Sequence, residues 1–267
     1  MPDKGTALIT GASTGIGAVY ADRLAKRGYN IILVARSKDK LDEVAKHIQS
    51  STGRKTETLQ ADLSIAADVK RVAERLASDS AITAFVNNAG IASAGKLLES
   101  DLDYLDQIVQ INVTAFTRLA IAAASNFAKR SSGLIINIGS VVALAPELLN
   151  GAYSGSKAYV QNFSTALKNE LADKGVTVQV VLPGATATSL WEKAGVNVHT
   201  DLPPEWVMTT EDMVDASLAG LDQGEFITIP ALPDAADLKA YENARLALAP
   251  NLSRKNPAPR YGVGAQK

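Results

Sequence analysis

The sequence predicts an α/β fold in which a doubly wound parallel sheet lies between two helical layers, a three-layer α/β/α arrangement. Short runs rich in Val, Ile and Thr alternate along the chain with longer stretches of helical periodicity. Strands separated by helices of about ten or more residues form right-handed βαβ units, whose parallel sheet is covered on both faces. Because the 267 residues contain no internal linker rich in Pro, Gly or Ser, we expect one domain, residues 1–267.

In the first half of the chain, each expected strand is a short apolar run and each expected helix is amphipathic. The strands are residues 6–10, 30–35, 56–60 and 82–86, and the helices are residues 18–27, 38–50 and 68–77. The helix at 38–50, for example, places Leu41, Val44, Ala45 and Ile48 on one face. Gly28 directly follows the first helix, where glycine commonly ends a helix.

The second half continues the same alternation. The expected helices are residues 103–129 and 153–174, and the expected strands are 133–138, 176–182 and 225–229. Gly175 is the expected stop of the second of these helices. The tail from Pro250 onward is the one segment whose composition indicates low order.

The composition excludes several classes of function. Lys and Arg total 27 against 28 Asp and Glu, a net charge of −1, whereas nucleic acids and anionic membranes require a concentrated positive field. Cys is absent, which removes thiol nucleophiles, disulfides and thiolate metal sites, and two histidines do not favour a metal site. Apolar runs such as 119–124 are far shorter than the ~20 residues of a membrane span. We therefore expect no metal, no nucleic acid and no membrane, and a cytoplasmic protein without a targeting segment.

A glycine-rich turn, TGASTGIG at residues 10–17, lies between the first strand and the first helix. At this place an open parallel sheet presents a helix N-terminus to a diphosphate, which indicates a dinucleotide-binding Rossmann fold. Gly11 suits the tight turn, Gly15 allows close approach of the ligand, and Gly17 allows the helix to pack on the sheet. The spacing is neither GxGxxG nor a P-loop, and a loop that merely needs flexibility is the alternative.

Arg36 indicates which dinucleotide is bound. It follows Gly17 by nineteen residues, at the end of the second expected strand, where proteins that bind NAD usually carry an acid. A guanidinium can hold a 2′-phosphate that a carboxylate would repel, and Lys38 and Lys40 follow closely. The sequence thus favours NADP(H), with NAD(H) as a possible cofactor, and a solvated basic start of a helix is the competing interpretation.

Tyr153 and Lys157 are four residues apart at the start of an expected helix, so they project from one face. Deprotonating a free Tyr, with a pKa near ~10, costs roughly 4 kcal/mol at pH 7, and a nearby ammonium lowers this cost. The pair can therefore serve in general acid–base catalysis, although Tyr-x-x-x-Lys is also common on solvated helices. Ser140 and the run NNAG at residues 87–90 each follow a strand, at the carboxyl edge where ligands bind.

Taken together, these motifs resemble the short-chain dehydrogenase/reductase family. The resemblance rests on TGASTGIG, the pair Asp62-Leu63, NNAG, Asn112, Ser140, YSGSK at 153–157 and Pro183-Gly184, in this order, and it covers residues 5 to about 230. It implies an oxidoreductase that transfers a hydride between a nicotinamide and a carbonyl/alcohol pair. The alternatives are an NAD-dependent alcohol dehydrogenase and a non-catalytic protein that senses nucleotides with the same fold.

The resemblance also implies a role for each matching residue. Tyr153 would exchange a proton with the substrate oxygen, to which Ser140 would form a hydrogen bond. Lys157 would bind the nicotinamide ribose and lower the pKa of Tyr153, and Asn112 would complete a proton relay. The implied cofactor contacts are Gly11, Ser13, Thr14, Gly15, Ile16, Gly17, Arg36, Asp62, Leu63, Asn88, Ala89, Gly90, Tyr153, Lys157, Pro183, Gly184, Thr186 and Thr188. Alone, Asp62 could be a helix cap before Ser64 and Asn112 a packing amide.

The family places its substrate lid after the Pro-Gly step, here at about residues 185–210. Leu190, Trp191, Val196, Val198, Trp206 and Met208, with Leu144 and Ala145, could form an apolar lid suited to a hydrophobic or aromatic carbonyl. Trp191 and Trp206 could equally pack the lid on the core. His199 is expected to be a polar loop residue, with a substrate contact as the alternative, and His47 a surface residue.

The resemblance further implies a homodimer or homotetramer assembled through the fourth and fifth helices. The apolar run within 103–129 fits such an interface. A C-terminal extension at about residues 231–267 is longer than the core fold needs, and we hypothesise that it covers the substrate cleft or a neighbouring subunit. The expected partner is otherwise a small carbonyl or alcohol substrate, with reduction the favoured direction.

Overall fold

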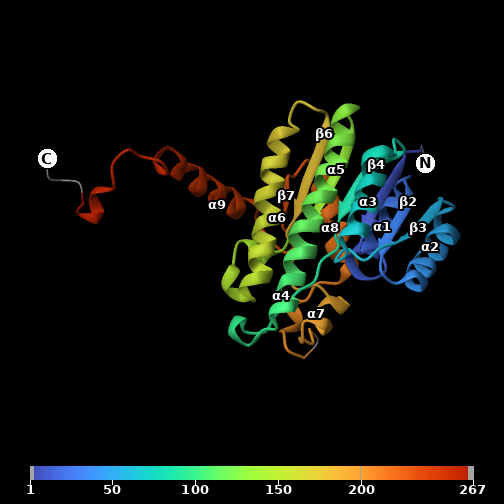
Figure 1. The fold of residues 1–267 in the computed structure, drawn as a ribbon, viewed down its shortest axis with the longest axis horizontal. Coiled ribbons are helices and arrows are strands. Elements are labelled where there is room, and N and C mark those ends of the chain that lie inside the picture. Colours follow the sequence, from blue (N-terminus) through green and yellow to red (C-terminus); the bar gives the residue numbers. More distant parts are fainter. Residues whose placement is uncertain (1–2, 199, 264–267) are drawn as a thin grey trace. The chain divides into compact units, whose positions relative to one another are not determined.

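The computed structural model describes residues 3–198 and 200–263 and contains a seven-stranded parallel sheet. The strands are β1 (Thr6–Thr10), β2 (Asn30–Ala35), β3 (Thr56–Gln60), β4 (Ile82–Asn87), β5 (Gly133–Ile138), β6 (Val176–Val181) and β7 (Ile227–Thr228), in the spatial order β3-β2-β1-β4-β5-β6-β7 (Figure 1). The order reverses between β1 and β4, and the carboxyl edge at such a switch point is where ligands bind in open α/β sheets. The predicted doubly wound α/β fold is confirmed.

Helices cover both faces of the sheet. They are α1 (Gly15–Lys26), α2 (Lys38–Thr52), α3 (Ala66–Ser78), α4 (Leu102–Val109), α5 (Phe116–Lys129), α6 (Gly151–Glu170), α7 (Ser189–Lys193), α8 (Thr210–Asp222) and α9 (Ala235–Leu248). Alternate residues of β1 belong to the hydrophobic cores on opposite faces of the sheet, because successive side chains of a strand point to opposite faces. Ile9 packs with residues of α1, α2 and α8, whereas Leu8 packs with residues of α3, α5 and α6. The sheet is therefore buried on both sides.

The helix expected at 103–129 is interrupted. It consists of α4, a π-helical segment at Gln110–Ala115 and α5, and Asp101 caps its start by accepting a hydrogen bond from the Asp103 amide. A π-turn adds a residue to the turn and redirects the side chains that follow it. Asn112 lies within this segment, so the irregularity sits at one of the predicted site residues.

Three observed helices, α7, α8 and α9, were not among the expected elements. In addition, α6 ends at Glu170 rather than 174, and β7 is shorter than the expected 225–229. Among the described residues, the short strand pairs with β6 alone, at the edge of the sheet. It ends two residues before Pro230, whose missing N–H cannot extend a ladder.

Among the residues that the structure describes, one continuous helical run, Leu102–Lys129, meets the length and hydropathy criteria for a membrane span, with a mean hydropathy of 1.3. Half of that apolar window is buried inside the protein, as in the core helix of a globular domain. The run packs against α3 and α6, and Leu119 and Phe127 lie in the core on that face of the sheet. Packing within the fold thus accounts for the buried half of its apolar residues, whereas Leu102 and Ile121 remain exposed.

The chain divides into two compact units, Met1–Ala231 and Leu232–Lys267. The boundary falls at the start of the extension expected from about residue 231. The second unit contains α9, whose first turn is capped by the Asp234 carboxylate through the Ala236 amide, and two short 3₁₀ turns, Ala249–Asn251 and Pro259–Tyr261. All the predicted site residues belong to the first unit.

Candidate active site

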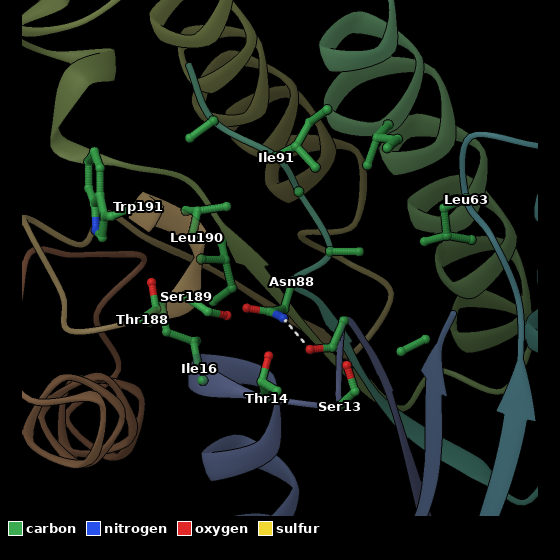
Figure 2. A pocket seen from close by; sticks show the side chains of 18 of the residues that line it. Ser13, Thr14, Ile16, Leu63, Asn88, Ile91, Thr188, Ser189, Leu190 and Trp191 are labelled. Atoms are coloured by element: carbon green, nitrogen blue, oxygen red, sulfur yellow. Dashed lines mark hydrogen bonds between the residues drawn. The ribbon is translucent and has the colours of Figure 1, made fainter. Parts of the chain in front are cut away.

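A cavity of about 450 Å³ opens at the carboxyl edge of the sheet (Figure 2). Most of the predicted site residues line it, although they come from segments far apart in the sequence. They are Gly11, Ser13, Thr14, Gly15, Ile16, Arg36, Asp62, Leu63, Asn88, Ala89, Gly90, Ser140, Tyr153, Lys157, Pro183, Gly184, Thr186 and Thr188. Gly17 and Asn112 are not part of the lining.

The glycine-rich turn forms one side of the cavity and leads into α1. Gly11 has φ +67° and Gly15 has φ +56°, a backbone region that favours glycine. A β-carbon on Gly17 would collide with the Gly11 carbonyl oxygen, and one on Gly15 would lie 3.2 Å from Thr188 Cγ2. Gly17 thus permits the helix to pack against its own entry turn, and Gly15 permits the lid to approach.

The N-terminus of α1 is suited to an anion. Its cap residue, Thr14, makes no side-chain capping bond among the described residues, and the first turn carries no acidic side chain. Backbone N–H groups at such an end, with the positive end of the helix dipole, attract phosphate. The turn therefore has the geometry and charge to hold a diphosphate.

The Asn88 side chain holds the glycine-rich turn in place by hydrogen bonds. Its amide nitrogen Nδ2 donates to the Thr10 carbonyl oxygen at 2.8 Å and to the Gly11 carbonyl oxygen at 3.4 Å, and the dashed line in Figure 2 starts at this amide. The Thr10 hydroxyl in turn accepts from the backbone amides of Asn88 and Ala89 at 3.0 and 3.1 Å. The Asn88 amide therefore holds β1 and β4 together at the cavity floor, a role that its motif did not reveal.

Arg36, at the far end of β2, is half exposed, and its guanidinium lies 3.9 Å from the Asp62 carboxylate. Lys40 also lines the cavity, whereas Lys38 pairs with Asp42 at 2.5 Å. Two cations, Arg36 and Lys40, thus border this end of the cavity. Lys38, which the sequence grouped with them, is held by a carboxylate of its own helix.

Asp62 forms the cap that was one of its two interpretations, and it also lines the cavity. Its Oδ1 accepts hydrogen bonds from the backbone amide of Ser64 at 2.9 Å and from the Ser64 hydroxyl at 2.7 Å. It therefore caps the turn before α3, and it also lines the cavity. The cap fixes the direction of the carboxylate and leaves its second oxygen toward Arg36.

Ser140, Tyr153 and Lys157 meet at the opposite end, and each is buried. Ser140 follows β5, and its hydroxyl donates to the Pro183 carbonyl oxygen at 3.4 Å. Tyr153 lies in the first turn of α6, and Lys157 follows one turn later, with its ammonium 5.7 Å from the centre of the Tyr153 ring. The Lys157 ammonium donates to the Ile138 carbonyl oxygen at 3.0 Å. The three side chains thus share one buried corner of the cavity.

Burial shifts the pKa values of Tyr153 and Lys157. It raises the pKa of Tyr153 to about 12, opposed in part by the hydrogen bond with Ser140. It lowers the pKa of Lys157 to about 8. The lowered pKa that the family resemblance implied for Tyr153 is therefore not found in this structure, because the loss of hydration outweighs other influences on the phenol.

Asn112 supports the wall behind this corner. Its Oδ1 accepts from the Ile91 amide at 3.0 Å, and its Nδ2 donates to the Ile91 carbonyl oxygen at 2.9 Å and to the Ser156 hydroxyl at 3.0 Å. These are the bonds of a packing amide. A β-carbon on Gly90 would lie 3.2 Å from Asn112 Oδ1 and 3.6 Å from Lys157 Nζ, so both polar atoms border Gly90.

Only part of the predicted apolar lid reaches the cavity. Leu190 and Trp191 line it (Figure 2). The Trp191 indole donates to the Thr186 carbonyl oxygen at 3.0 Å. Trp206 is 66% exposed and lies outside the lining. The remaining expected lid residues, Leu144, Ala145, Val196, Val198 and Met208, are likewise not part of the lining. His199 lies outside the described residues, and His47 is exposed on α2, as expected.

Several lining residues were missed by the motif analysis. They are Ser37, Ile91, Ala92, Tyr104, Ile111, Ser189 and Glu192, besides backbone neighbours of the motifs. Ile91 and Ala92 directly follow NNAG, so their place was available from the motif. The sequence indicates a cavity position for Tyr104 only weakly, because Tyr104 is a polar aromatic residue in the first turn of an apolar helix. Within residues 3–198 and 200–263, no cluster of three or more His, Asp or Glu side chains is placed to hold a metal ion.

The lowered pKa of Lys157 predicts how stability depends on pH. Unfolded Lys keeps its proton up to the ordinary pKa of 10.5, whereas the folded protein releases it at about 8. Between these values the unfolded state binds more protons, so the free energy of unfolding should rise with pH, by about 2 kcal/mol from pH 7.5 to 9.5. Above pH 10 the raised pKa of Tyr153 reverses the sign, because the folded state then binds more protons.

Chemical denaturation of wild type and Lys157→Met at pH 7.5, 8.5 and 9.5 measures this effect. The rise is expected in the wild type and should be absent in the variant, which keeps a side chain of similar length without the amine. Equal pH slopes in the two proteins would show that Lys157 does not titrate in this range.

Comparisons with known proteins agree with this geometry. The family model for short chain dehydrogenases matches residues 5–198. A short-chain dehydrogenase from Sphingobium yanoikuyae, solved in complex with NADPH, superposes with a TM-score of 0.92 at 43% identity, covering 95% of this chain and 98% of that one. A bulky-bulky ketone specific alcohol dehydrogenase from Comamonas testosteroni superposes with a TM-score of 0.89 at 40% identity, covering 97% of this chain and 99% of that one.

Among curated proteins, human 17-beta-hydroxysteroid dehydrogenase type 3 is 37% identical over 205 residues. The match covers 75% of this chain and 65% of the human protein, so the present chain spans somewhat less than two thirds of that relative. The two solved structures, by contrast, match over nearly their whole length.

Proposed function

The chain belongs to the short-chain dehydrogenase family and is an oxidoreductase of that family, and from this premise we propose that it reduces a bulky apolar ketone with NADPH. The single observation that carries the proposal is one cavity with a buried Ser–Tyr–Lys corner at one end and two cations, Arg36 and Lys40, at the other. The first arrangement suits proton transfer to a carbonyl oxygen, and the second suits a phosphate.

The residues present fit NADP(H). The Arg36 guanidinium is half exposed at the cavity edge and close to a carboxylate that only partly neutralises it, so it can bind a 2′-phosphate. The uncapped N-terminus of α1 offers backbone N–H donors to the diphosphate. When bound, the nicotinamide supplies the hydride. The structure from Sphingobium yanoikuyae, described as a complex with NADPH, supports this cofactor over NAD(H).

Tyr153 serves as the general acid in this proposal. Burial raises its pKa to about 12, so the phenol carries its proton at neutral pH. It would give this proton to the carbonyl oxygen as that oxygen gains negative charge on reduction. The Ser140 hydroxyl holds that oxygen with a second hydrogen bond. Lys157 would bind the ribose of the cofactor with its ammonium, which lies 5.7 Å from the centre of the Tyr153 ring, and Asn112 supports this corner through the Ile91 backbone.

The substrate end of the cavity is largely apolar. Leu190 and Trp191 come from the lid, and Ile91, Ala92 and Tyr104 come from the segment after β4 and from α4. Such a lining favours hydrophobic groups on both sides of the carbonyl, and the apolar side chains leave Lys157, which the Ile138 carbonyl oxygen already engages, as the cation at this end among the described lining residues. The alcohol dehydrogenase from Comamonas testosteroni, described as specific for bulky-bulky ketones, supports this class.

We also propose that the protein is cytoplasmic and forms a homodimer or homotetramer through the helices expected as fourth and fifth, which are α4 with α5 and α6 in the structure. Leu102 and Ile121 are 75% and 51% exposed on these helices, although both are apolar, which supports burial of this surface in an assembly.

A ketone panel tests the proposed function. Purified protein is mixed with NADPH or NADH and with aryl alkyl ketones, diaryl ketones, acetone or a ketose phosphate, and oxidation of the reduced cofactor is followed by absorbance. We expect kcat/KM for the aryl ketones with NADPH to exceed that for acetone by about tenfold or more, because each buried CH₂ contributes ≈0.8 kcal/mol. Preference for the ketose phosphate, or turnover with NADH alone, would contradict the proposal.

A further inference from the structure

One wall of the cavity is a chain segment without a regular strand or α-helix, residues 91–101, which we call the rim segment. It leaves β4 after the NNAG motif and contains a 3₁₀ turn, Leu97–Glu99. Ile91 and Ala92 at its start line the cavity, and Figure 2 shows Ile91 facing into it. Ala92 is buried and packs with Val142 and Tyr153. The position of this segment therefore determines how much space remains beside the Tyr153 phenol.

Irregular segments at a binding site move easily unless side chains hold them, because few backbone hydrogen bonds cross their length. Here α4 holds the start of the rim segment, since the Tyr104 hydroxyl donates to the Ala92 carbonyl oxygen at 2.8 Å. The rest of the rim segment contacts a different element, the first turn of α6, and the connection is made by Asn150.

Asn150 is 5% exposed and uses both ends of its amide. Its Nδ2 donates to the Gly95 carbonyl oxygen at 2.9 Å and to the Ser100 hydroxyl at 3.1 Å, both in the rim segment. Its Oδ1 accepts from the Ala152 backbone amide at 2.9 Å and thereby caps the N-terminus of α6. One side chain thus starts the helix that carries Tyr153 and also holds the opposite wall.

Asn150 forms a helix cap with its Oδ1 and a tether, by which we mean the two hydrogen bonds from its Nδ2 to the rim segment. The cap and the tether need different chemical groups. A helix cap needs only an acceptor oxygen, which Asp and Ser supply as well as Asn. The tether needs the two N–H donors of the amide, which neither Asp nor Ser provides in this geometry. The cap alone could be formed by Asn, Asp or Ser. The two acceptors in the rim segment explain why the residue here is Asn.

We propose that Asn150 is a positioning residue that holds the rim segment at a fixed distance from Tyr153 and so determines which ketone substituents fit between them. The inference rests on the proposed reduction of ketones and deepens it. Asn150 does not line the cavity. It acts through the Gly95 and Ser100 atoms that it holds, whereas the cap that starts α6 is kept in both test variants.

Asn150→Asp is the test variant, because it keeps the capping oxygen and replaces both N–H donors with a carboxylate oxygen. Asn150→Ser is the second variant, in case a carboxylate at this buried site prevents folding. The matched control is Asn126→Asp, since the Asn126 amide also donates to two backbone carbonyl oxygens, those of Leu76 and Asp79, at 2.7 and 3.1 Å. Those bonds join α5 to the end of α3, away from the cavity lining.

Two readouts are compared for the three variants and wild type. Hydrogen–deuterium exchange measures the mobility of residues 91–101, and steady-state kinetics measures KM and kcat for a bulky aryl ketone and for acetone. We expect faster exchange in the rim segment in both Asn150 variants and a KM for the bulky ketone raised about tenfold, the effect of losing one to two net hydrogen bonds. We expect kcat and the KM values for acetone and NADPH to stay within about twofold.

Unchanged exchange in residues 91–101 would overturn the proposal, whatever the kinetics. Faster exchange accompanied by equal changes in KM for the bulky ketone and acetone, or by changes as large in Asn126→Asp, would also overturn it, because a merely structural role predicts those results. If wild type reduces no ketone, the proposed function fails instead, and the exchange data alone then decide whether Asn150 holds the rim segment.

Discussion

Replacing Tyr153 with phenylalanine is expected to lower kcat for ketone reduction by about 10²–10⁴-fold, the usual contribution of a positioned general acid. The substitution removes one oxygen from a buried ring that packs with Ala92 and Val142, so the packing should persist. Binding of NADPH should change little, since the turn before α1 and the Arg36 end lie at other parts of the cavity. Single-turnover kinetics and NADPH titration measure the two effects separately.

Tyr159→Phe is the matched control for this variant. Tyr159 lies on the same helix, and its hydroxyl contacts the Thr117 hydroxyl at 2.8 Å outside the cavity lining. Loss of that hydroxyl should leave turnover within about twofold and affect only stability, by about 1 kcal/mol. A Tyr153→Phe protein that retained most of the wild-type rate would refute the assignment of the phenol as the proton donor.

The features that the sequence predicted well are those determined by local patterns. Strand and helix order follows from hydrophobic periodicity, so the doubly wound sheet could be predicted without any contact information. The glycine-rich turn is likewise local: the positive φ of Gly11 and Gly15 is a property of the turn itself. Because parallel strands end at one edge, the motifs that follow β1, β2, β4, β5 and β6 necessarily meet there.

Features that depend on distant partners were harder to predict. The π-helical segment around Asn112 leaves the apolar pattern of the surrounding helix almost unchanged, so periodicity does not reveal it. Trp191 and Trp206 have similar surroundings in the sequence, yet only Trp191 reaches the cavity, where the Thr186 carbonyl holds its indole. The raised pKa of Tyr153 depends on total burial, a property of the assembled fold.

The helix α8 shows a signal that was present and not used. Thr209 caps it by accepting from the Asp212 amide, and the Asp212 carboxylate accepts from the Thr209 hydroxyl, a reciprocal arrangement close to a capping box. Met213, Val214 and Leu218 then follow at helical spacing and are buried. A search for caps after the lid would have predicted this helix from the sequence.

Replacing Arg36 with aspartate is expected to raise the KM for NADPH by about 10- to 100-fold, the cost of losing charge-assisted hydrogen bonds worth ≈1.5–3 kcal/mol. The new carboxylate would repel the 2′-phosphate and lie near Asp62, which faces Arg36 at 3.9 Å in the wild type. The KM for NADH should change by threefold at most or fall, because a ribose 2′-hydroxyl can donate to a carboxylate. Cofactor kinetics with one ketone measure both values.

Lys38→Asp is the matched control for Arg36→Asp. It reverses the same charge two residues away, but Lys38 pairs with Asp42 and does not line the cavity. At 0.15 M salt, where charges are screened over about 8 Å, its long-range effect on a phosphate at Arg36 should be small. A rise in the KM for NADPH confined to Arg36→Asp would therefore report contact with the 2′-phosphate. If Arg36→Asp raises the KM values for NADPH and NADH equally, Arg36 does not distinguish the two cofactors. If Arg36→Asp and Lys38→Asp raise the KM for NADPH equally, the effect comes from the net charge at this end of the cavity.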